Sequence, residues 1–189
     1  SKSDNFEIVK YMIDSGINVK KLCDYLLHDM SDIRDKFFTR SVKYIYDKNL
    51  IGINDKYTYK MFDSLCTFNK YELVEYFINK GMDMGKRINI PLKIVVTDNN
   101  VDIVKLIVYN EEYCKYIYPS NKYFTYACKY GFIKIVKILH PYVNISPDVD
   151  VNYSYESALL NACKNGHLDV VVHIIENDPD IQLCNKALR

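Results

Sequence analysis

The chain has 189 residues, of which 49% are hydrophobic, which is enough to bury a folded core. Its 25 Lys and Arg against 24 Asp and Glu give a net charge of +1, so overall charge provides no bias toward nucleic acid, an anionic membrane or acidic substrates. No run of about eighteen apolar residues and no signal-peptide pattern occurs, so we expect no membrane span and no cleaved leader in this sequence.

One helical pattern recurs along the chain. Each copy begins with an anchor residue that is usually acidic or polar, and apolar residues follow at the spacing of one helical face. The anchors are Glu7, Arg40, Glu72, Asp102, Lys134 and Asp169. Their spacings of 33, 32, 30, 32 and 35 residues predict a two-helix repeat, and they exclude a heptad coiled coil or an array of strands.

A second, shorter helical pattern precedes most anchors. It covers 60–69, 90–99, 122–131 and 157–166, and a looser version falls within 20–36. Pro91 lies where a first helical turn is expected, the position at which a missing N–H costs least. Gly16, Asn49 and Gly81 close three of the longer copies and predict helix C-terminal stops.

These units resemble ankyrin repeats, whose pattern is T-P-L-H-x-A-A, then G-H-L-E, an apolar second helix and a closing G-A-D. The matching residues are Pro91, Leu92, Ala127, Ala162, Gly131, Gly166, His167, Leu168, Gly16 and Gly81. The resemblance implies an all-α solenoid of about six stacked helix-turn-helix repeats in a single array. The repeats would span approximately 1–19, 20–52, 53–84, 85–115, 116–146 and 147–182, with a further repeat starting at 183–189.

Two departures from the ankyrin pattern concern its loops. The threonine and histidine that link successive turns in the family are replaced in every copy, which predicts less uniform loops. The longest interval contains Pro141 and Pro147 and predicts a longer loop. Richness in Tyr, Lys, Asn and Ile resembles ankyrin-repeat proteins of large DNA viruses of protists, such as mimivirus-like viruses. The expected location is intracellular, in the cytoplasm, or in host cytoplasm or the virion if the chain is viral.

The six cysteines form no C-x-x-C pair, which favours a reduced intracellular protein. Cys163 and His167 lie four residues apart with His173 nearby, a spacing that could hold a metal. However, Cys66, Cys128 and Cys163 occupy equivalent repeat positions that we expect to be small and buried. We therefore predict packing there, with neither a metal nor another cofactor.

The sequence gives equally little support for other catalytic or ligand-binding groups. His167 occupies a structural position of the family pattern, and the other three histidines, His28, His140 and His173, are scattered over different repeats. The acidic pairs at 111–112 and 148–150 fall in expected loops, where solvated charge is the ordinary role. The segment 81–86 follows a helix and lacks the spacing of a Walker motif. We expect no catalytic residues, no enzyme activity and no small-molecule substrate.

The ankyrin resemblance also implies which residues contact a partner. They are Lys56, Tyr57, Tyr59 and Thr67; Lys86, Arg87, Asn89 and Thr97; Tyr118, Pro119, Asn121 and Lys129; and Tyr153, Ser154, Glu156 and Lys164. Four are tyrosines, five are basic and one is acidic. Tyrosine is common in interface hot spots, and the positive excess favours an acidic partner surface.

The sequence thus predicts a protein-binding adaptor or scaffold that uses its concave face and hairpin loops. One alternative is nucleic-acid binding through interleaved Lys and Tyr, against which the net charge of +1 argues. Another is a self-assembling or virion-associated array. A role in targeting proteins for degradation would need an F-box-like segment, and this sequence contains none.

Overall fold

The computed structural model describes residues 6–28, 35–117, 121–143 and 155–177. These residues form twelve α-helices and two short 3-10 helices, and no strand occurs among them. The chain divides into two compact units, Ser1–Met84 and Gly85–Arg189, which we call the N-terminal and C-terminal units.

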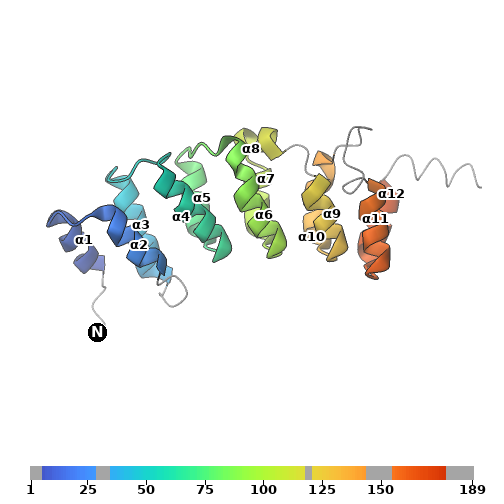
Figure 1. The fold of residues 1–189 in the computed structure, drawn as a ribbon, viewed down its shortest axis with the longest axis horizontal. Helices are drawn as coiled ribbons and strands as arrows, with labels where there is room; N and C mark the ends of the chain where they lie inside the picture. Colours follow the sequence, from blue (N-terminus) through green and yellow to red (C-terminus); the bar gives the residue numbers. More distant parts are fainter. Residues whose placement is uncertain (1–5, 29–34, 118–120, 144–154, 178–189) are drawn as a thin grey trace, which may run out of the picture. The chain divides into compact units, whose positions relative to one another are not determined.

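The N-terminal unit is built from helical hairpins. Its helices are α1 (Phe6–Asp14), α2 (Val19–His28), α3 (Asp35–Asp47), α4 (Lys56–Thr67) and α5 (Tyr71–Asn79). Helix α4 packs on α2, while α3 packs on both α1 and α5. Helices α2 and α4 therefore form a first layer, and α1, α3 and α5 form a second layer (Figure 1).

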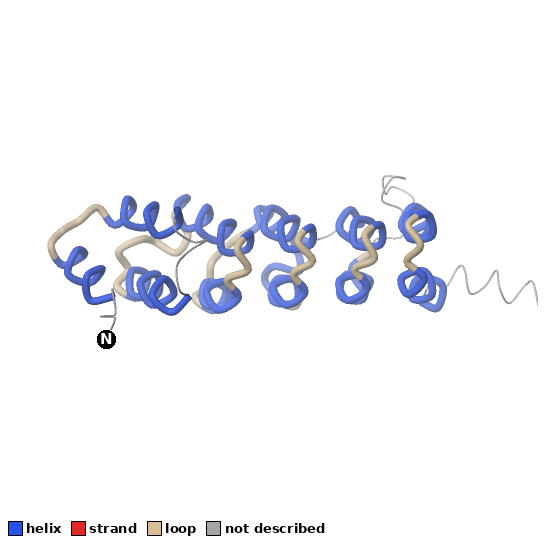
Figure 2. Tube along the Cα trace, turned by 90° about the horizontal axis from the view of Figure 1, so that it is seen from below, coloured by secondary structure: helices blue, strands red, loops and turns tan. Residues whose placement is uncertain are grey.

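The C-terminal unit repeats this two-layer arrangement. Its elements are η1 (Gly85–Ile88), α6 (Asn89–Thr97), α7 (Val101–Val108), α8 (Glu111–Ile117), α9 (Asn121–Lys129), α10 (Ile133–Leu139), η2 (His140–Tyr142), α11 (Tyr155–Lys164) and α12 (Leu168–Asn177). Helices α6, α9 and α11 lie side by side in the first layer, and α7, α10 and α12 form the second. Figure 2 shows these layers as two rows of helices joined by short loops.

The expected helices are confirmed throughout the described residues. Each of the six anchors lies in, or at the start of, a second-layer helix, and the shorter patterns correspond to α4, α6, α9 and α11. The loosely fitting segment contains all of α2 except its first residue, Val19. Pro91 lies in the first turn of α6, as predicted.

The expectation that Glu111 and Glu112 lie in a loop is wrong. They form the first turn of helix α8. The Asn110 side chain caps this helix by accepting hydrogen bonds from the amides of Glu112 and Tyr113 at 3.1 and 3.0 Å. Acidic residues in a first turn also interact favourably with the helix dipole. The sequence analysis missed this helix because it falls between two copies of the repeat.

Several of the repeat helices end in the same backbone conformation. Gly16, Asn49 and Gly81 have φ of 82°, 52° and 75°, which confirms the predicted stops in the left-handed region. The first-layer helices α4, α6, α9 and α11 end at further residues of positive φ, namely Asn69, Asn99, Gly131 and Gly166. At each stop a pair of amides bonds back to the last turn, and this pair recurs at the intervals of the sequence repeat.

The predicted apolar face is buried most completely in the middle of the C-terminal unit. In α7, Ile103, Val104, Ile107 and Val108 have no exposed surface. In α12, Val170 and Ile174 are fully buried, whereas Val171 and Ile175, also expected in the interior, are half-buried. Helix α12 is the last described helix of its layer, so only one side of it is covered within the described residues.

The equivalent cysteines differ in burial. Cys66 and Cys128 are buried as predicted, and burial raises the pKa of the Cys128 thiol to about 12. Cys163 is exposed, which corrects the expectation that it packs in the interior. It lies on α11, the last first-layer helix that the structure describes, so no described helix covers its outer side.

Some predictions fall outside the described residues. They concern the long loop around Pro147, the acidic pair at 148–150 and the further repeat at 183–189. Within the described residues, no helix is both long and apolar enough to cross a membrane.

Candidate binding surface

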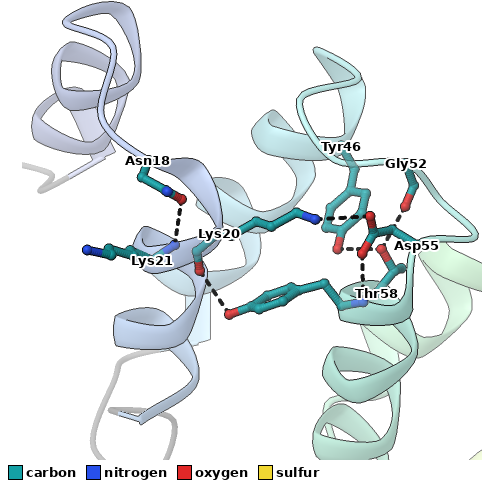
Figure 3. Close-up of polar contacts among 8 residues, drawn as sticks. Asn18, Lys20, Lys21, Tyr46, Gly52, Asp55 and Thr58 are labelled. Carbon is teal, nitrogen blue, oxygen red and sulfur yellow. Dashed lines mark hydrogen bonds and ion pairs between the residues drawn. The ribbon is translucent and has the colours of Figure 1, made fainter.

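A tyrosine links the two first-layer helices of the N-terminal unit. The Tyr57 hydroxyl, on α4, donates to the Lys20 carbonyl oxygen at 2.9 Å and also contacts the Asp24 carboxylate on α2. Figure 3 shows the Lys20 side chain extending to Asp55, where Nζ and Oδ2 are 3.1 Å apart. Burial, and then the neighbouring Asp24, raise the pKa of Tyr57. Tyr57, a predicted partner contact, therefore also holds two repeats together.

The second layer of this unit has comparable links. The Tyr76 hydroxyl on α5 donates to Asp47 of α3 at 2.8 Å, and Lys80 lies 2.7 Å from the same carboxylate. These hydrogen bonds, that of Lys80 foremost, hold the pKa of Asp47 below its ordinary value. Lys43 of α3 pairs with Glu72 of α5 at 2.6 Å. Lysines on both layers of this unit are thus engaged by carboxylates of adjacent repeats.

The C-terminal unit uses other groups for the same purpose. The Tyr123 hydroxyl donates to the Asn89 carbonyl oxygen at 2.9 Å, which links α9 to α6. His167 Nε2 lies 3.0 Å from the Lys129 carbonyl oxygen, which confirms the structural role predicted for this histidine. A Cβ on Gly131 would lie 2.5 Å from His167 Nδ1, so the backbone of one repeat approaches the imidazole of the next very closely.

Two histidines expected to be scattered lie together in the structure. His140 begins η2, directly after α10, and His173 lies within α12. Their ring atoms Nδ1 of His140 and Nε2 of His173 are 3.1 Å apart. Burial, then Lys137, lower the pKa of His173, while Glu176 acts in the opposite direction. Their separation of 33 residues matches the repeat period, and this was the signal that could have predicted the pair.

The predicted partner contacts differ in exposure. Five of them are exposed, namely Lys56, Thr67, Lys129, Glu156 and Lys164. Five others are half-buried, namely Tyr57, Tyr59, Arg87, Asn89 and Thr97. Asn121 is only 2% exposed and lies in the interior of its unit, contrary to its expected surface position. The Lys86 side chain and residues Tyr118, Pro119, Tyr153 and Ser154 lie outside the described part of the structure.

A cavity of about 290 Å³ opens on the first layer of the C-terminal unit, over α6, α9 and α11. It brings together two predicted contact residues, Thr97 and Lys129. It also contains residues that the sequence analysis missed, among them Lys93, Lys122 and Tyr126. The helical spacing of Lys122 and Lys129, seven residues apart on α9, could have placed both on one face.

Tyr126 extends the cavity into an aromatic surface. Its ring centroid lies 4.5 Å from that of Tyr130, and the Tyr130 ring stacks on Phe132 with centroids 6.0 Å apart. Tyr130 is 46% exposed, so part of this cluster is open to solvent beside the lysines. Among the described residues, no group of three or more His, Cys, Asp and Glu side chains is arranged to hold a metal ion.

Stacked helical hairpins with repeated caps and repeat-to-repeat hydrogen bonds define a helical repeat protein. Residues 92–185 match the family model described as "Ankyrin repeats (3 copies)". The chain belongs to the ankyrin-repeat family, whose repeats are in general protein-protein interaction modules and typically lack enzyme activity.

A curated relative is the "Putative ankyrin repeat protein L56" of Acanthamoeba polyphaga mimivirus, which is 33% identical over 75 residues. The matched segment is 38% of this chain and 11% of the relative, so the similarity spans about a tenth of the viral protein's length. No solved structure matches this chain.

Proposed function

We propose that the protein is a non-enzymatic binding module, an adaptor or scaffold, that holds a partner protein on the first layer of its C-terminal unit. The observation that supports this most directly is the cavity over α6, α9 and α11, which contains Thr97 and Lys129 of the predicted contact set. Two more predicted contacts, Glu156 and Lys164, are exposed on α11 of the same layer.

The composition of this surface suits a protein interface. Tyr126 and Tyr130 offer large contact areas at low conformational cost, and exposed lysines surround them. An adjacent concave site of about 290 Å³ would give a partner side chain a place to insert. The exposed, unpaired thiol of Cys163 suits an intracellular, reducing location for this binding.

Cross-linking of the whole chain in a lysate of its source cells, followed by mass spectrometry, tests the proposal. Lysine-reactive cross-links to a partner protein are expected at Lys129 and Lys164 of the first layer. The exposed second-layer lysines, Lys105, Lys134 and Lys137, are an internal control of similar reactivity and should give few cross-links.

Three results would contradict the proposal. Cross-links confined to the second-layer lysines would place the interface elsewhere. Cross-links only between copies of this chain, together with oligomers in sedimentation at increasing concentration, would favour a self-assembling array. Tight binding of oligonucleotides that declines steeply with added salt, without a protein partner, would favour nucleic-acid recognition.

A further inference from the structure

We infer that the cavity over α6, α9 and α11 receives a carboxylate side chain from an acidic peptide segment of the partner. This inference rests on the proposed binding function and specifies the chemistry of its partner. Three lysines, Lys93 of α6 and Lys122 and Lys129 of α9, line the cavity, and none of its described lining residues is acidic.

The lysines of the cavity lack the described carboxylate partners that several lysines of the N-terminal unit have. All three are exposed, and no described carboxylate lies within ion-pair distance of any of them. In the N-terminal unit, by contrast, Lys43 and Lys80 lie 2.6 and 2.7 Å from carboxylates of a neighbouring helix or its end. Three like charges around one concavity attract an anion, because each contributes to the same positive potential.

A buried hydroxyl provides a second, independent observation. Thr125 lines the cavity and is only 6% exposed, yet its Oγ1 has no hydrogen-bond partner among the residues that the structure describes. Buried polar groups without partners are rare in folded proteins because each loses its hydrogen bonds to water. A hydroxyl can donate to a carboxylate oxygen, so a bound acidic side chain would satisfy the group that the free protein leaves unpaired.

The remaining lining residues fit the rest of an acidic side chain. The half-buried Tyr126 ring provides apolar surface for an aliphatic stem, and Asn161 adds a carboxamide. The Asn161 Nδ2 donates to the Ser157 carbonyl oxygen at 2.9 Å, which orients this side chain. Asp98 adjoins the cavity without lining it, and its Oδ1 lies 3.5 Å from Thr97 Oγ1.

The lining favours a carboxylate over a phosphate group. It contains lysines and no arginine, whereas planar recognition of phosphate commonly uses the bidentate arginine fork. The adjoining rings of Tyr126 and Tyr130 suit a peptide backbone and an apolar neighbour of the acidic residue. The cavity therefore fits an Asp or Glu residue within a peptide, and the longer stem of Glu suits it better.

The test uses hexaglutamate and its neutral counterpart hexaglutamine as probes on the whole chain. Nitrogen-15 NMR at low salt is expected to show hexaglutamate shifting the amides of Lys93, Thr125 and Lys129, with no shifts from hexaglutamine. A triple variant, Lys93→Gln, Lys122→Gln and Lys129→Gln, should weaken hexaglutamate binding about tenfold or more. The matched control, Lys105→Gln, Lys134→Gln and Lys137→Gln, makes the same charge change on the second layer and should alter binding less than about threefold.

Equal losses in the two triple variants would overturn the inference, because binding would then depend only on net charge. Preferential binding of a phosphopeptide or of oligothymidine over hexaglutamate would also overturn it. Thr125→Val, which keeps the side-chain shape, should weaken hexaglutamate binding several-fold without lowering the stability of the free protein. Unchanged binding in this variant would contradict the role of the hydroxyl.

The inference and the proposed function fail in different ways. Partner cross-links at Lys129 without hexaglutamate binding would contradict the carboxylate site and support the binding module. Hexaglutamate binding at the cavity, with no protein partner captured in cells, would support the site and contradict the adaptor function. The loss of amide shifts around Thr125 in the cavity triple variant is a readout that general misfolding would not mimic, provided that the remaining spectrum is unchanged.

Discussion

The two units link their repeats with different chemistry. In the N-terminal unit, carboxylates of one repeat hold the lysines and tyrosines of the next, as in the contacts of Asp47 and Asp55. In the C-terminal unit, the described links include a tyrosine or histidine bound to a backbone carbonyl and histidine bound to histidine, and no ion pair between repeats occurs among the described residues. The difference shows how one fold can either neutralise its lysines internally or leave them available to a partner.

Individually, the exposed ion pairs of the N-terminal unit contribute little stability, because solvent screens them. Their larger effect is on the surface that remains. Lys20 and Lys43 already have carboxylate neighbours, whereas Lys93, Lys122 and Lys129 gather around a cavity with none. The following predictions test whether the links differ as described, from the largest expected effect to the smallest.

The backbone of Gly131 lies close to the His167 imidazole of the next repeat. Gly131→Ala should reduce the free energy of unfolding by roughly 2–3 kcal/mol, because it combines a strained φ of 71° with a clash against the imidazole. Gly166→Ala is the matched control, since its φ is 75° and its Cβ would meet nothing within 4 Å. It should cost about 1 kcal/mol in the same urea titration. Equal losses would show that the imidazole moves aside at no cost.

The tyrosine links can be compared by removing one hydroxyl at a time. Tyr57→Phe in the N-terminal unit and Tyr123→Phe in the C-terminal unit should each cost about 1 kcal/mol of unfolding free energy. Hydrogen exchange should localise the first loss to α2 and α4 and the second to α6 and α9. Tyr130→Phe, a change at a 46% exposed ring, serves as the control and should be near neutral. A loss of protection in the other unit would contradict the assignment of these links.

Acidification should weaken the C-terminal unit through the histidine pair. The folded-state pKa of His173 lies below its ordinary value of 6.5, so the unfolded chain binds the proton more tightly. The contribution of the neutral His173 side chain to the free energy of unfolding is fully present above about pH 6.5. It is lost as the pH falls toward the lower folded-state pKa. Urea titrations at pH 7 and 5 should show the loss, and His173→Gln should reduce it. The same pH dependence in the variant would exclude His173 as its origin.

Added salt should have the smallest effect and should distinguish the units. Raising the salt concentration from about 0.05 to 1 M screens exposed ion pairs. Hydrogen exchange should therefore become slightly faster across α4 and α5, where Lys20 and Lys43 make their pairs, than across α9 and α10. Sodium chloride is preferable to sulfate salts, because sulfate strengthens apolar burial in both units. Identical changes in the two units would contradict the difference in linkage.

The helices were predicted well because the same helical spacing of apolar residues recurs in every copy of the repeat. The sequence also located the stops at Gly16, Asn49 and Gly81, where positive φ limits the choice of residue. Residues at the last described repeat were predicted less well. Cys163 has the sequence position of Cys128, but burial depends on a neighbouring helix that the pattern of a single repeat cannot specify.

The candidate site was predicted only in part. Thr97 and Lys129 were found through their positions in the repeat, but Lys93 and Lys122 were not, because neither falls at a position that the family pattern assigns to partners. The tyrosine links could not be derived from composition, since a tyrosine in a hot spot and a tyrosine between repeats look alike in a sequence. Separation along the chain would have helped to find these tyrosines, because many of the links join residues about one repeat apart.

The recurring helix caps have a consequence for how genes of this kind change length. Each α-helical residue rotates the chain by about 100°, so an insertion within a helix turns every later side chain away from its layer. A duplication or deletion whose two ends fall at equivalent caps, such as Asn99 and Gly131, adds or removes a whole hairpin and preserves both layers. Recombination at these points would alter the number of binding positions while leaving each remaining repeat intact.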